Sequence, residues 1–156
     1  MRAEGVKSVY KENNVVKASV NPLIKLLNEN NIAIEQLPCP EVKWEGLKRP
    51  ASGLSRYDNE SYKKVCKEIA DEVVNLIKEY IKNGIEVVGI VGVNGSPSCG
   101  VEFTSNRIKS KGIFMKILDE TLKNNGIYVK FVGFRAKTNE ELIKSLERVR
   151  SILDNT

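Results

Sequence analysis

The feature that most constrains the fold is an apolar run, IEVVGIVGV at residues 85–93, placed directly after a long helical pattern. A run that is apolar at almost every position is typical of a strand covered on both faces. Before it, residues 59–82 carry apolar side chains at helical spacing, and Asn83-Gly84 ends that pattern. An expected helix at 113–123 and an expected strand at 127–134 repeat the alternation. This order predicts an α/β fold with a small, mainly parallel sheet.

The remaining patterns extend this alternation. Pro22 begins an expected helix near the N-terminus, and IAIEQLP at residues 32–38 indicates a short strand. Thr138 and Glu141 form a capping box for a last helix, and residues 41–58 are expected to form a loop. Helices that cover both faces of such a sheet would give a three-layer, Rossmann-like sandwich.

Length and charge limit the classes of protein. The 156 residues predict one α/β domain, residues 1–156, in which residues 1–20 form an irregular N-terminal segment. No apolar run approaches a membrane span, and no secretory pattern is present, so we expect a cytoplasmic chain without a membrane partner. The net charge is +5, but the lysines are scattered among glutamates, so we do not expect nucleic acid as a partner. The oligomeric state is left open.

The chain has three cysteines and no histidine. The absence of histidine excludes a histidine base and a Ser-His-Asp triad. Three cysteines far apart argue against a disulfide framework. Cys39 follows the expected strand 32–38, and Cys99 follows the run 85–93. Because the carboxyl ends of parallel strands share one edge, we expect Cys39 and Cys99 to face one crevice, unless both are incidental loop thiols. Cys66 lies beside the apolar stripe of its helix and is expected in the core, with a role as a ligand as the alternative.

The loop around Cys99 is rich in small residues. Backbone N–H groups near Gly95 and Gly100 can approach an anion such as a thiolate-bound iron–sulfur cluster, and Ser96 and Ser98 add hydroxyl donors. The alternative is a glycine loop used for close packing. Glu41 is a candidate general acid or base, or a solvated loop residue. A further set of cations is a candidate for holding an anionic substrate: Lys48, Arg49 and Arg135.

Three short motifs carry a resemblance. LPCPE at 37–41, GLKRP at 46–50 and GSPSCG at 95–100 resemble the thiouracil desulfidase (TudS-like) family, in its TudS-related branch. The resemblance implies a small α/β domain with a [4Fe-4S] cluster held by three cysteines, with one iron left open. It implies a small-molecule substrate, a thiolated nucleobase or a similar small thioamide, whose sulfur binds that iron and is replaced by water.

The same resemblance assigns roles. Cys39 and Cys99 would be metal ligands, Glu41 would handle protons, and Ser96 would position substrate or cluster sulfide. The family's third ligand would fall near Ser8, where this chain has no cysteine. Either Cys66 replaces it, or Ser8, Glu41 or a water binds an iron weakly. Otherwise the cluster is lost, and the chain is a degenerate relative that serves as a small-molecule or metal–sulfur binding module. Thiol-based transfer through Cys39 or Cys99 is a further alternative.

Overall fold

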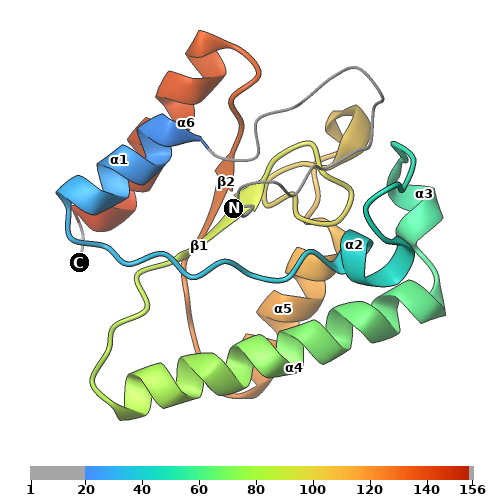
Figure 1. Cartoon of the computed structure of the whole chain (residues 1–156), viewed down its shortest axis with the longest axis horizontal. Helices are drawn as coiled ribbons and strands as arrows, with labels where there is room; N and C mark the ends of the chain where they lie inside the picture. Colours follow the sequence, from blue (N-terminus) through green and yellow to red (C-terminus); the bar gives the residue numbers. More distant parts are fainter. Residues whose placement is uncertain (1–19, 155–156) are drawn as a thin grey trace.

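A computed structural model describes residues 20–154, shown in Figure 1. The irregular N-terminal segment expected at 1–20 lies outside this range except for its last residue, and so does Ser8. The elements in chain order are α1 (Asn21–Glu29), α2 (Pro40–Glu45), α3 (Leu54–Tyr57), α4 (Glu60–Lys82), β1 (Ile90–Val93), the short 3-10 helix η1 (Ser105–Arg107), α5 (Ile113–Asn124), β2 (Phe131–Phe134) and α6 (Asn139–Leu153).

Strands β1 and β2 form a parallel pair, so the expected mixed fold with a small parallel sheet is confirmed. Ile90 lies opposite Phe131, and the register continues to Val93 opposite Phe134. Both strands are shorter than the sequence predicts, because only the last four residues of each apolar run pair with the other strand. Two strands do not make a Rossmann-like three-layer sandwich, and that finer expectation is not confirmed.

The prediction of a strand at residues 32–38 was wrong. This segment belongs to no strand, because no backbone of the described residues takes up its ladder hydrogen bonds. Ile34 is exposed, and Leu37 is only partly buried against the core. Alternating apolar residues favour an extended chain, but a strand also needs a neighbouring chain to pair with.

The helices pack on both sides of the strand pair (Figure 1). On one side, α4 and α5 enclose a cluster that includes Ile69, Leu118 and Ile90. On the other side, α1 and α6 enclose a second cluster that includes Leu23 and Val132. Alternate residues of the strands therefore enter different clusters, as the pleat of a strand requires.

Helix boundaries follow the capping residues. The Asn59 side chain accepts a hydrogen bond from the Tyr62 N–H at 2.9 Å, and α4 begins there as predicted. The Thr138 hydroxyl accepts from the Glu141 N–H at 3.2 Å, which confirms the predicted cap of α6. The loop expected at 41–58 instead contains α2 and α3. Pro40 begins α2, because proline at the first helical position loses no hydrogen bond.

Among the helices of residues 20–154, none combines the length and the apolar character needed to cross a membrane.

Candidate functional site

Cys99 lies in a tight loop that leaves the carboxyl end of β1. The Ser96 hydroxyl oxygen accepts hydrogen bonds from the Ser98 N–H at 3.2 Å and the Cys99 N–H at 3.0 Å. The Gly100 N–H donates to the Ser96 carbonyl at 3.1 Å, and the Gly95 N–H donates to the Phe103 carbonyl at 3.0 Å. The loop is therefore fixed from within by its own backbone and by one serine.

The glycines of this loop allow close packing. A Cβ at Gly100 would overlap the Phe103 carbonyl oxygen and lie 2.9 Å from the Ser96 carbonyl oxygen. A Cβ at Gly92, in β1, would overlap the Cys99 carbonyl oxygen. The N–H groups of Gly95, Ser98 and Gly100 donate inside the loop or to its neighbour Phe103. Contact of these groups with a cofactor therefore remains a prediction.

Cys39 and Glu41 lie at the start of α2, where a buried arginine holds them. Arg49 Nε donates to Glu41 Oε2 at 2.8 Å, and Arg49 Nη2 lies 3.8 Å from Cys39 Sγ. The Tyr57 hydroxyl donates to the same Glu41 Oε2 at 3.5 Å. Arg49 is 2% exposed and Glu41 is 7% exposed, so this ion pair is shielded from water. Glu41 is thus a buried, oriented carboxylate rather than a solvated loop residue.

Arg49 has one donor group without an acceptor. Its Nη1 is buried and finds no hydrogen-bond partner among the described residues. Burial lowers the pKa of Arg49, but the hydrogen bond and the charge of Glu41 raise it to a net value above the ordinary one, so the guanidinium stays charged. A buried donor without an acceptor costs about 1–3 kcal/mol, which a ligand could recover.

Aromatic rings connect the two halves of the site. The rings of Tyr57 and Tyr62 lie 4.8 Å apart between centroids, and Trp44 packs edge-on against both. The Tyr62 hydroxyl is hydrogen-bonded to the buried Ser98 hydroxyl, which joins α4 to the Cys99 loop. Burial and the charge of Glu41 raise the pKa of Tyr57 to about 12, so its phenol remains protonated at neutral pH.

Two of the cysteines have raised pKa values. Burial, followed by the charges of Glu41 and Cys39, raises the pKa of Cys99 to about 12. Burial also raises the pKa of Cys66 to about 12, with contributions from Cys99 and Glu41. Cys66 is fully buried in the core between α4 and α5, as predicted. We name Cys39, Glu41, Arg49, Ser96 and Cys99 the cysteine site.

The donor set fits a metal cluster only in part. Cys39 and Cys99 are the two half-buried thiols of the cysteine site. Within residues 20–154, no three His, Cys, Asp or Glu side chains are arranged to hold a metal ion. The part of the chain that the structure describes therefore offers two thiols but no three-ligand group for a cluster.

The other predicted cations are placed differently. Lys48 is exposed next to Arg49. Arg135 lies at the carboxyl end of β2, where its Nε donates to Glu141 at 2.8 Å and its Nη1 to the Asn94 carbonyl at 3.2 Å. Of the three cations, only Arg49 is part of the cysteine site.

Sequence reasoning missed Tyr62 and the specific Arg49–Glu41 pair. Tyr62 precedes Cys66 by four residues on α4, so the two share a helix face, and this spacing could have revealed it. The pairing of Glu41 with Arg49 had no such signal, because it depends on how the chain turns after α2.

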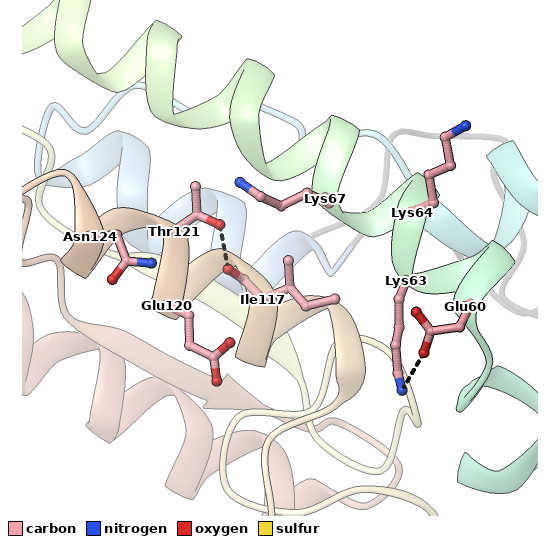
Figure 2. A pocket seen from close by; sticks show the side chains of 8 residues that line it. All are labelled: Glu60, Lys63, Lys64, Lys67, Ile117, Glu120, Thr121 and Asn124. Carbon is pink, nitrogen blue, oxygen red and sulfur yellow. Dashed lines mark hydrogen bonds and ion pairs between the residues drawn. The ribbon is translucent and has the colours of Figure 1, made fainter.

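A surface groove between α4 and α5 is separate from the predicted site residues (Figure 2). Charged side chains line much of it, and Lys63 pairs there with Glu60 at 3.5 Å. The Thr121 hydroxyl at its wall donates to the Ile117 carbonyl at 2.7 Å within α5. The groove contains no cysteine and no residue of the cysteine site, and its lysines and glutamates are typical of a solvated surface.

The fold and the site define a small α/β protein with a buried carboxylate–guanidinium pair beside two thiols. Residues 6–144 match the family model described as "Putative 2-thiouracil desulfurase", and the chain belongs to that family. The family expected from the three motifs is thus confirmed. The chain is also 25% identical to "Uncharacterized protein MJ0003" of Methanocaldococcus jannaschii over 135 residues, which cover 85% of this chain and 82% of that protein. No solved structure matches the chain.

Proposed function

We propose that this protein removes sulfur from a thiolated nucleobase or a similar small thioamide. The observation that carries the proposal is the buried Glu41 carboxylate, which Arg49 holds beside the Cys39 thiol in a chain of this family. A carboxylate beside a sulfur-binding group is what hydrolytic removal of sulfur requires.

Glu41 is suited to handle the protons of this reaction. Arg49 and Tyr57 both donate to Oε2, which fixes the carboxylate and leaves Oε1 outside these two hydrogen bonds. Glu41 would take one proton from a water as the oxygen of that water bonds to the thiocarbonyl carbon. The carbon–sulfur bond then breaks, and the sulfur leaves with the second proton as hydrosulfide. The reaction consumes one water and needs no oxidant or reductant.

A [4Fe-4S] cluster is the cofactor that the family resemblance implies, and Cys39 and Cys99 would hold it. When bound, it would supply a Lewis acid that polarises the substrate's sulfur. The Ser96 hydroxyl oxygen accepts hydrogen bonds from the Ser98 and Cys99 N–H groups and would thereby hold Cys99 in position. The hydroxyl proton of Ser96 is not used in these bonds and would be free to donate to a sulfur or a substrate atom.

The Cys99 thiol does not favour a thiol-transfer reaction. The nucleophile in such chemistry is a thiolate with a lowered pKa. The pKa of Cys99 is instead raised to about 12 by burial and by Glu41, so this thiol is neutral at pH 7. Deprotonation of Cys99 would need a bound metal.

The test is formation of uracil from 2-thiouracil under anaerobic conditions, with the full chain incubated beforehand with iron and sulfide. Glu41→Gln should lower turnover by about 100-fold or more, because the amide cannot accept a proton. Glu68→Gln, on the exposed face of α4, should leave turnover unchanged. Full turnover in Glu41→Gln would remove Glu41 from the mechanism. An iron-loaded wild type that makes no uracil would contradict the proposal for this substrate.

Iron and acid-labile sulfide counts test the cofactor separately. Cys39→Ser and Cys99→Ser should each abolish the cluster, and Cys66→Ala should retain it because Cys66 is core. Loss of iron from a folded Cys66→Ala variant would instead make Cys66 the replacement ligand.

A cluster-free binding module is the second candidate, favoured by the absence of an arranged three-ligand group in residues 20–154. A chain that takes up no iron and makes no uracil, but binds a small thioamide saturably, would support this candidate over the enzyme.

A further inference from the structure

Arg49 presents a donor that the rest of the site does not use. Its guanidinium is fully enclosed, Nε donates to Glu41, and Nη2 lies against the Cys39 sulfur. Only Nη1 is without an acceptor among the described residues. Buried donors in native proteins are almost always satisfied, so an orphan of this kind calls for an explanation.

Its position follows from the shape of the guanidinium. The group is planar, and Nη1 and Nη2 share one carbon, so their N–H groups form a common edge. Since Nη2 lies against Cys39 Sγ, an acceptor that bridges Nη1 and Nη2 would lie next to that sulfur. Cys39 is half-buried, so a small ligand can approach its sulfur from solvent, and a small movement of the side chains that enclose Arg49 would bring it to this edge.

The surroundings select the kind of acceptor. The groups around the guanidinium are the Cys39 sulfur, the Glu41 carboxylate on Nε and the Tyr57 phenol, which donates to the same carboxylate. Such surroundings offer little to replace the water of a strongly hydrated ion. A weakly hydrated anion with a sulfur acceptor loses less hydration free energy than chloride or sulfate when it moves from water into this site. It also gains a charge-assisted hydrogen bond from Arg49.

We propose that Arg49 is the anion-binding residue of the cysteine site, and that its Nη1 takes the sulfur acceptor of a small, weakly hydrated anion beside Cys39. This role concerns recognition and holds with or without a cluster. It also gives the Arg49–Glu41 pair a defined charge dependence, because Glu41 partly neutralises the guanidinium that the anion must meet.

The test uses thiocyanate as the probe and the full chain without added iron. Trp44 is the only tryptophan of the chain and packs against Tyr57, so its fluorescence reports on the site. Thiocyanate should bind saturably to the wild type, and chloride at equal ionic strength should bind at least tenfold more weakly. Arg49→Met should weaken thiocyanate binding at least tenfold, whereas Lys48→Met, at the exposed neighbour, should change it less than twofold.

Two further variants keep the test decisive if Arg49→Met does not fold. Arg49→Lys keeps the charge but has no second nitrogen to donate, and it should weaken binding at least fivefold. Glu41→Gln removes the neutralising charge and should tighten binding at least threefold. Unchanged affinity in folded Arg49→Lys, or weaker binding in Glu41→Gln, would overturn the proposal. Because no iron or turnover enters the measurement, its result is independent of the desulfuration assay.

Discussion

The two halves of the cysteine site are held by different means. The Cys99 loop is fixed by short-range backbone hydrogen bonds, by the Ser96 hydroxyl and by glycines that admit no side chain. The Cys39 half is held by side chains: the buried ion pair between Glu41 and Arg49, the Tyr57 hydroxyl on Glu41, and Trp44 packed against two tyrosines. A loop fixed by its own backbone tolerates the loss of a distant side chain, whereas a segment held by a buried ion pair depends on both partners of that pair.

The largest expected effect is at that ion pair. Arg49→Met should destabilise the fold by about 3–5 kcal/mol, because it leaves the Glu41 carboxylate buried and alone. The double variant Arg49→Met/Glu41→Gln should be more stable than Arg49→Met by about 2 kcal/mol, because it buries no unpaired charge. Urea unfolding of both variants and of Glu41→Gln measures this coupling. If the effects simply add, the two side chains are not coupled and the contrast between the halves is lost.

In the Cys99 half, the corresponding disruption is steric. Gly100→Ala should cost about 3 kcal/mol, because its Cβ meets two backbone oxygens that cannot move aside. Gly53→Ala is the control, since its Cβ meets only the Ser105 hydroxyl at 3.7 Å, and it should cost about 0.5 kcal/mol. The free energy of unfolding from urea denaturation tests both, and equal effects would mean that the loop adapts.

Alkaline pH should lower the free energy of unfolding through Cys66, which is buried in the core between α4 and α5. Burial raises the pKa of Cys66 to about 12, so the unfolded chain loses this proton first, near pH 8.5. Stability is therefore full below about pH 8.5 and falls as the pH rises towards 12, by about 2 kcal/mol per such thiol at pH 10. Urea midpoints at about pH 7.5 and pH 10 measure the loss, and Cys66→Ala should reduce it. A loss of the same size in Cys66→Ala would exclude Cys66 as a source.

The smallest effect is expected at Ser96. Ser96→Ala removes the acceptor of two loop N–H groups and should cost about 1 kcal/mol. Because the other backbone bonds of the loop remain, the chain should stay folded while Cys99 is alkylated faster than in the wild type. Ser55→Ala, at an exposed serine of α3, should change neither quantity. An unchanged alkylation rate in Ser96→Ala would show that the glycines alone fix the loop.

The same contrast separates what the sequence could predict from what it could not. Periodicity, the cap at Thr138 and the apolar runs are local signals, and they predicted α1, α4, α5, α6 and the parallel pair. The strand expected at 32–38 failed because strand formation depends on a partner chain, which periodicity does not reveal. α2 was missed because Pro40 suggests a break in regular structure when it can also begin a helix.

For the site, short sequence motifs identified several of the residues but not the contacts between them. Cys39, Glu41 and Cys99 stand out in short motifs, and the structure places Cys39 and Glu41 on one arginine, Arg49. The Arg49–Glu41 pair joins residues 8 apart in the sequence, and the Tyr62–Ser98 hydrogen bond joins residues 36 apart. No local pattern encodes these contacts, or the Nη1 of Arg49 that is left without an acceptor among the described residues.

The most direct test of the account is whether Cys39 and Cys99 meet at one site. In a Cys66→Ala background, an alkylating reagent that fluoresces only after joining two thiols should label the native chain about once, by linking these two cysteines. Adding Cys39→Ser or Cys99→Ser should abolish the fluorescence. Separate modification of the two thiols in the folded chain, without the cross-link, would contradict a shared site.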